Sequence, residues 1–126
     1  MVGLVVVSHG RKAAEGIVEV AAEMGGDTRI EPAGGDGRGG FGTVPDDIAA
    51  AVEVADDGVG VVVLVDLGSA VMNAEVAVET GDVEAVIADA PVLEGAVEAA
   101  VAATDPKATL DSVRERAEAA RDVKKL

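Results

Sequence analysis

The chain has 126 residues, of which 49% are hydrophobic, and its 10 basic and 24 acidic side chains give a formal net charge of −14. This length fits one domain, and this apolar content is enough for a buried core, so extensive disorder is excluded. With one Phe, no Trp, no Tyr and a large negative charge, the chain lacks the stacking aromatics and cationic surface that nucleic-acid binding requires.

The composition also bears on cysteine chemistry, on membrane insertion and on the salt concentration in which the protein works. The chain has no cysteine, which excludes disulfides and cysteine nucleophiles and favours a reducing cytoplasm. No apolar run reaches the roughly 18 residues of a membrane span, and no basic segment precedes the apolar residues 2–7, so neither a span nor a signal peptide is expected. The acidity is expected to reflect adaptation to high salt, where carboxylates are screened, with a functional acidic patch as the alternative.

The first half of the chain predicts two strands buried on both faces. Residues 2–8 and residues 59–65 are continuous apolar runs rather than alternating ones, which is typical of strands in a parallel sheet. Between them, apolar side chains at three- and four-residue steps predict helices over residues 12–24 and 45–55. A short strand is predicted over residues 28–32.

Six glycines in the eleven residues 33–43 indicate a functional loop or a mobile lid. After the second buried strand, Ser69 is expected to cap a helix over residues 70–79. A weaker strand is predicted over residues 84–88. The chain is expected to finish with helices over residues 92–103 and 109–124, the last with two lysines at its C-terminal end.

The alternation of strands and helices predicts the fold. We expect one α/β domain over residues 1–126, doubly wound, with a mainly parallel four-stranded sheet and helices on both faces. In such sheets, sites gather at the carboxyl ends of the strands, near the switch in strand order. The chain segments at these ends are residues 8–10, the 33–43 loop, residues 66–69 and Asp89.

His9 is the only histidine and follows the first strand directly. A neutral imidazole at that edge can act as a nucleophile or base, whereas the simpler interpretation is a structural histidine. Asp66 ends the strand predicted over residues 59–65. If these two strands are neighbours, its carboxylate would fix the tautomer of His9; otherwise it is an ordinary loop-capping residue.

An anion site is predicted at the start of the next helix, because Ser69 and the amides around it are exposed N–H donors at a helix N-terminus. Asn73 lies one turn further on the same face and is expected to orient loop groups or to be a solvated polar side chain. Thr43 and the glycine loop offer a further phosphate contact or a plain connection. No metal-ligand cluster and no GxGxxG turn is present, so neither metal nor cofactor is expected.

Three segments resemble one known family. They are residues 8–16, which begin Ser-His-Gly and end Ala-Glu-Gly, residues 62–75 (VVLVDLGSAVMNAE) and residues 89–96 (DAPVLEGA). Together they are similar to the phosphoryl-donor subunits, DhaM, of dihydroxyacetone kinases that depend on the phosphotransferase system. That family's first domain is itself similar to the mannose-type EIIA domain.

The resemblance implies a function and a set of partners. It implies that His9 accepts a phosphoryl group from phospho-HPr and passes it to ADP on the subunit DhaL, for phosphorylation of dihydroxyacetone on DhaK. It also implies a homodimer, with Asp66 orienting His9 and Thr43 near the mouth of the site. The expected contacts to the phosphoryl group come from Gly10, Gly68, Ser69, Ala70 and Thr43.

Other interpretations stay open on the sequence. Because the chain stops at Leu126, its phosphoryl donor is expected to be a separate protein. The Ser-His-Gly start also resembles small tetrapyrrole metal chelatases, but these need a second histidine. A non-catalytic regulatory or binding module on a flavodoxin-like fold is the third interpretation, with His9 as a surface group.

Overall fold

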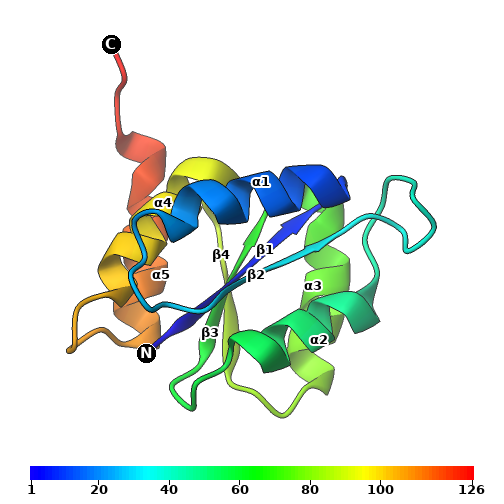
Figure 1. The fold of residues 1–126 in the computed structure, drawn as a ribbon, viewed down its shortest axis with the longest axis horizontal. Coiled ribbons are helices and arrows are strands. Elements are labelled where there is room, and N and C mark those ends of the chain that lie inside the picture. Colours follow the sequence, from blue (N-terminus) through cyan, green and yellow to red (C-terminus); the bar gives the residue numbers. More distant parts are fainter.

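A four-stranded sheet lies between two layers of helices in the computed structural model, which describes residues 1–126 (Figure 1). Helices α1, α4 and α5 cover one face, and α2 and α3 cover the other. In chain order the elements are β1 (Gly3–Ser8), α1 (Arg11–Ala22), β2 (Ile30–Gly34), α2 (Pro45–Ala55), β3 (Val61–Val65), α3 (Gly68–Thr80), β4 (Ala85–Ala88), α4 (Val92–Ala103), α5 (Leu110–Ala119) and a 3-10 turn (Ala120–Asp122).

The strand order is β2-β1-β3-β4, and every pair is parallel. This confirms the predicted α/β architecture with helices on both faces. After β2 the chain crosses back over β1 to build β3 and β4 on the other side, so the order switches between β1 and β3. Val7 of β1 lies opposite Val65 of β3. The residues that follow these two strands therefore meet at the edge where ligands bind in open α/β sheets.

The continuous apolar runs are explained by burial on both faces. Leu4 and Val6 of β1 pack into the core under α1, α4 and α5, while Val5 and Val7 enter the core against α2 and α3. Successive side chains of a strand point to opposite faces, so both sets must be apolar. The two cores hold the central strands rigidly and leave only their ends free for polar side chains.

Two glycines allow unusually close packing of the backbone. A Cβ atom on Gly3 would lie 2.0 Å from the carbonyl oxygen of Ala55, at the end of α2. A Cβ atom on Gly34 would lie 2.8 Å from the carbonyl oxygens of both Ser8 and Gly10. The end of β2 can therefore press directly against the turn that follows β1.

Several predicted boundaries were wrong. The strand predicted over residues 28–32 is β2, which lies two residues further on, at Ile30–Gly34. Pairing with β1 begins at Leu4 and Ile30, so residues 28 and 29 precede the strand. The helix predicted over residues 109–124 ends at Ala119 and tightens into the 3-10 turn. The final lysines are thus beyond the helix. None of the helices combines the length and the apolar character that crossing a bilayer requires.

Candidate functional site

The imidazole of His9 lies against the carboxylate of Asp66 at the carboxyl ends of β1 and β3. Its Nδ1 is 3.0 Å from Oδ1 of Asp66, and its side chain is 25% exposed. The backbone N–H of Asp66 donates to the carbonyl of Val7, which joins the two strand ends. The predicted pairing of histidine and aspartate is therefore present, and the ring keeps an open face.

The other oxygen of Asp66, Oδ2, accepts two hydrogen bonds. Ser8 Oγ donates to it at 2.8 Å, and the backbone N–H of His9 donates at 3.1 Å. Burial alone would raise the pKa of Asp66, but the bonds from the His9 N–H, the His9 ring and Ser8 outweigh it and leave that pKa below 3.8. Asp66 is therefore ionised at neutral pH.

An ionised Asp66 determines which nitrogen of His9 can react. A carboxylate only accepts, so the atom facing it must be Nδ1–H. In the neutral ring, Nε2 then carries the lone pair and accepts from the hydroxyl of Ser69, 2.8 Å away. The geometry leaves Nε2 as the ring nitrogen with a lone pair, at the start of α3.

Ser69 was predicted to be the N-cap of its helix, and that prediction was wrong. The cap position belongs to Leu67, and α3 begins at Gly68, so Ser69 lies within the first turn with its side chain free to reach His9. The N–H groups of Gly68 and Ser69 have no acceptor in the chain, whereas that of Ala70 donates to Leu67. Two of the three predicted amides are thus available to an anion beside Nε2.

The remaining predicted residues lie around this centre. Asn73 Nδ2 donates to both the carbonyl and the hydroxyl of Thr43, at 3.1 and 2.7 Å. Asn73 therefore ties the glycine-rich loop to α3, in the orienting position expected for it. Thr43 contacts Asn73 rather than the ring of His9. The N–H of Gly10 donates to Ser8 Oγ, so it is occupied within the turn.

Ser8 is the residue that the sequence analysis missed. Its side chain is buried and joins the N–H of Gly10 to the carboxylate of Asp66. The one available signal was a hydroxyl at the end of an otherwise aliphatic strand, directly before the histidine. A buried hydroxyl needs a partner, and the nearest strand end supplies a carboxylate.

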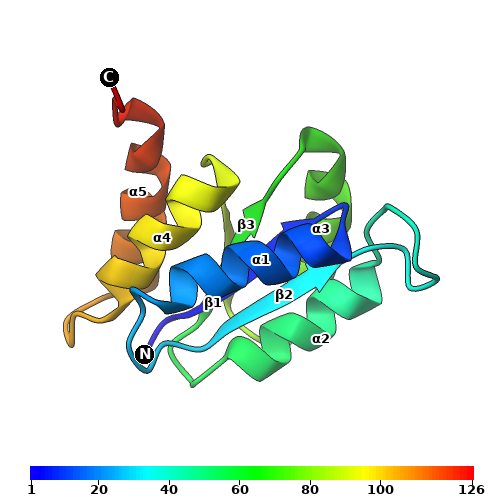
Figure 2. The same ribbon diagram turned by 45° about the horizontal axis from the view of Figure 1, so that its top comes forward.

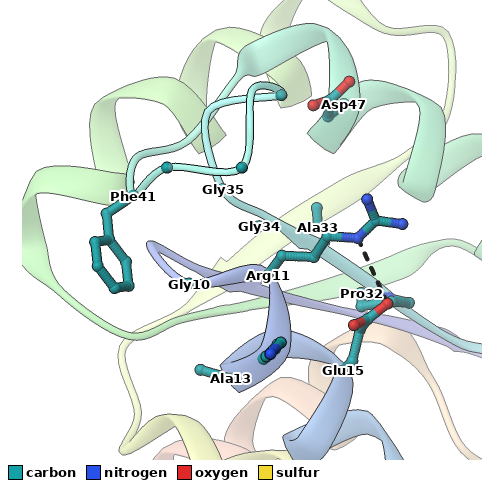
Figure 3. Close-up of a pocket in the computed structure, with 14 residues that line it drawn as sticks. Gly10, Arg11, Ala13, Glu15, Pro32, Ala33, Gly34, Gly35, Phe41 and Asp47 are labelled. Atoms are coloured by element: carbon teal, nitrogen blue, oxygen red, sulfur yellow. Dashed lines mark ion pairs between the residues drawn. The ribbon is translucent and has the colours of Figure 1, made fainter.

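The loop between β2 and α2 is internally hydrogen bonded and borders a cavity of about 750 Å³ (Figure 3). Asp36 accepts from the N–H groups of Arg38 and Gly40, which lowers its pKa, and the N–H of Gly42 donates to the carbonyl of His9. The cavity is lined by Arg11, by the end of β2 and by the loop, but not by the His9 ring. Nε2 of His9 therefore lies outside this cavity.

Comparison with known proteins identifies the family of the chain. Residues 3–114 match the sequence model of the EIIA-man family, described as the PTS system fructose IIA component. The chain belongs to the EIIA-man family. A solved structure of a protein of unknown function shares this EIIA-man fold with a TM-score of 0.80 and 28% identity, each chain being covered to 94%.

Curated relatives of this EIIA-man domain are named as DhaM, the phosphoryl donor or phosphotransferase subunit of dihydroxyacetone kinases. One from Listeria innocua, called DhaM of kinase 2, is 41% identical over 106 residues, which are 80% of this chain and 85% of the relative. One from Lactococcus lactis is 32% identical over 116 residues, 92% and 93% of the two chains. A relative from Providencia stuartii is longer, and its 33% identical match covers 28% of it. The predicted resemblance to DhaM is confirmed.

Proposed function

We propose that this EIIA-man domain is the phosphocarrier subunit of a dihydroxyacetone kinase that depends on the phosphotransferase system. His9 would take a phosphoryl group from phospho-HPr and pass it to ADP held by DhaL, for use on dihydroxyacetone bound to DhaK. The observation that carries the proposal is the contact of Nδ1 with Asp66, which leaves Nε2 free beside the start of α3.

The proposed first step is attack of the Nε2 lone pair on phosphorus. The phosphorus–nitrogen bond of the donor breaks, and its electron pair stays with the donor ring. The ring of His9 then carries Nδ1–H and a phosphoryl group on Nε2, and Asp66 balances its positive charge, as in a catalytic triad. In the second step a terminal oxygen of ADP attacks the same phosphorus, and the bonding pair returns to Nε2.

The start of α3 supports this proposal because phosphoryl transfer depends on alignment and on donors aimed at the transferred oxygens. The unpartnered N–H groups of Gly68 and Ser69 lie at the positive end of the helix dipole. Ser69 Oγ can turn from Nε2 to a phosphoryl oxygen once the group is attached. Asn73 and Thr43 close the loop side of the site.

The proposal includes a homodimer, which the resemblance to DhaM implies, and a cytoplasmic location, which the lack of cysteine favours. Adaptation to high salt stays a prediction from the composition. The chelatase interpretation needs a second histidine, and the chain has none. A purely regulatory module would not require the ionised carboxylate and the open Nε2 that the site contains.

Intact-mass measurement tests the proposal directly. The chain is mixed with phosphoenolpyruvate, the general enzyme of the phosphotransferase system and HPr. We expect a mass increase of one phosphoryl group that is lost in acid, as phosphohistidine is, and that is absent in His9→Ala. No increase in the wild-type chain, while HPr itself becomes phosphorylated, would overturn the proposal.

Replacing Ser69 with Ala separates its effect on the stability of the fold from its effect on the stability of the phosphohistidine. Because Ser69 is exposed and is not the cap, we expect the free energy of unfolding to change by no more than about 0.5 kcal/mol. Loss of its hydroxyl should shorten the lifetime of the phosphohistidine, since one donor to the phosphoryl oxygens is removed. The two measurements are a urea melt and the decay of the phosphorylated mass. An unchanged lifetime would contradict the assigned role.

A further inference from the structure

The only aromatic residue of the chain lies in solvent at the rim of the site. Phe41 is 86% exposed, although burying an aromatic side chain in the core would be favourable. Its Cε1 is 3.5 Å from the place where a Cβ atom on Gly10 would lie, so the ring stands over the turn that follows His9 (Figure 3). An exposed aromatic in this position needs an explanation.

The loop around Phe41 is built to present that side chain. The N–H of Asp36 donates to the carbonyl of Gly40, and the side chain of Asp36 accepts from the N–H of Gly40. On the other side of Phe41, Gly42 has a φ of 141° and donates to the carbonyl of His9. The backbone is thus fixed directly before and directly after Phe41. The loop that carries Phe41 leaves the end of β2 beside the start of α1 (Figure 2).

Two more apolar side chains are exposed near the start of α3. Leu67 is 56% exposed and Met72 is 71% exposed, and they bracket Ser69, whose hydroxyl contacts Nε2. Asn73, next to Met72, bonds to Thr43, two residues after Phe41. The apolar rim, defined as Phe41, Leu67 and Met72, therefore consists of exposed side chains on the two segments that contact His9, the loop and the start of α3.

The charges near the rim differ from those of the whole chain. Arg11 and Lys12 open α1 directly after the site turn, and Arg38 lies in the loop three residues before Phe41. Arg11 pairs with Glu15 at 3.6 Å, whereas Lys12 and Arg38 form no ion pair within the chain. The other cations are Arg29, near the amino ends of the strands, and those within residues 107–125. On a chain of net charge −14, this local set favours a partner that brings a negative group to His9.

We infer that the apolar rim is the docking surface for the phosphorylated donor protein. This inference rests on the proposed function. The occupant is a protein whose phosphohistidine is surrounded by apolar side chains: its phosphoryl group meets the free amides of α3, its negative charge is attracted by Lys12 and Arg38, and its apolar surface covers Phe41 and Met72. Exposed aromatic side chains that become buried are the usual anchors of such contacts. Covering the rim also removes water from the phosphorus during transfer.

The test compares two phosphoryl donors of different size. Phosphoramidate is a small molecule and needs no docking surface, whereas phospho-HPr does. We expect Phe41→Ala and Met72→Ala each to lower the second-order rate constant with phospho-HPr by about tenfold, as anchor residues do. Labelling of His9 by phosphoramidate should stay within about twofold of wild type, because the geometry of the ring is untouched.

Met24→Ala and Val54→Ala are matched controls, because both side chains are exposed and lie away from the site, Met24 two residues after the end of α1 and Val54 in the last turn of α2. Both should behave as wild type with both donors. Equal rates for the rim and control variants with phospho-HPr would overturn the docking inference while leaving phosphorylation of His9 intact. A rim variant that changes only the oligomeric state would also overturn it, by assigning the rim to a second copy of the chain. Failure of both donors to label wild-type His9 would overturn the proposed function instead.

Discussion

Asp66→Asn is expected to lower the rate of phosphoryl transfer by about 10²- to 10⁴-fold, the range that a positioned acid–base partner contributes. The side chain keeps its size and shape, so the fold should be retained. What changes is the hydrogen-bonding character of the group that faces Nδ1 of His9, 3.0 Å away. The loss would arise from the ring's tautomer and not from its position.

The surrounding hydrogen bonds decide how the new amide is oriented. The backbone N–H of His9 is a fixed donor to the Oδ2 position, and Ser8 Oγ donates there too. The amide oxygen of an Asn should take this place, which leaves its NH₂ facing Nδ1. Nδ1 must then accept, so the ring proton moves to Nε2 and the lone pair needed for attack is lost.

Single-turnover transfer from phospho-HPr measures the rate, and nitrogen-15 NMR of the ring reports the tautomer. Asp82→Asn, an exposed carboxylate before β4, is the matched control and should leave both unchanged. A wild-type rate in Asp66→Asn would contradict the orienting role. A slow variant whose Nδ1 still carries the proton would show that the tautomer is not the cause.

Leu64→Ala is expected to destabilise the fold by about 2–5 kcal/mol, a large part of the roughly 5–15 kcal/mol that holds a domain of this kind folded. Leu64 is fully buried in β3, under α4 and α5. Its Cδ1 would lie 3.4 Å from a Cβ atom on Gly95, so it packs directly against the backbone of α4. The space left by truncation is framed by a central strand and a helix backbone, and it cannot close easily.

Chemical unfolding followed by circular dichroism gives the free-energy difference. Leu93→Ala is the control, since the same atoms are removed from an exposed side chain of α4. It should cost markedly less than Leu64→Ala. Equal losses for the two variants would mean that the core against α4 and α5 does not dominate stability. Variants that remain folded should still be phosphorylated on His9, because Leu64 does not contact the ring.

The central strands and the pairing at their ends could be predicted from the sequence. A continuous valine-rich strand is favourable only when both of its faces are buried. Burial on both faces places β1 and β3 in the middle of the sheet. His9 and Asp66 come directly after these runs. Their meeting therefore followed from strand order and needed no knowledge of the loops.

Other features of the site and the sheet depend on packing contacts that the spacing of apolar residues does not predict. Ser69 has the residue type of a cap, yet Leu67 takes that position and frees Ser69 to reach His9. The role of Ser8 depends on the direction of one hydroxyl in the buried turn. The place of β2 depends on close approach at Gly34, which only the three-dimensional arrangement reveals.

The position of the reacting pair has a consequence for how such domains diversify. His9 and Asp66 are held by a backbone hydrogen bond between neighbouring strands, so their separation follows from the roughly 4.8 Å spacing of the sheet. The outer faces of the helices contribute nothing to that separation, and the loop after β2 contacts the pair through one backbone hydrogen bond, from Gly42 to the carbonyl of His9. Evolution can therefore exchange surface charge and recognition segments freely, and grafting a relative's loop onto this scaffold should change the choice of partner while keeping the chemistry.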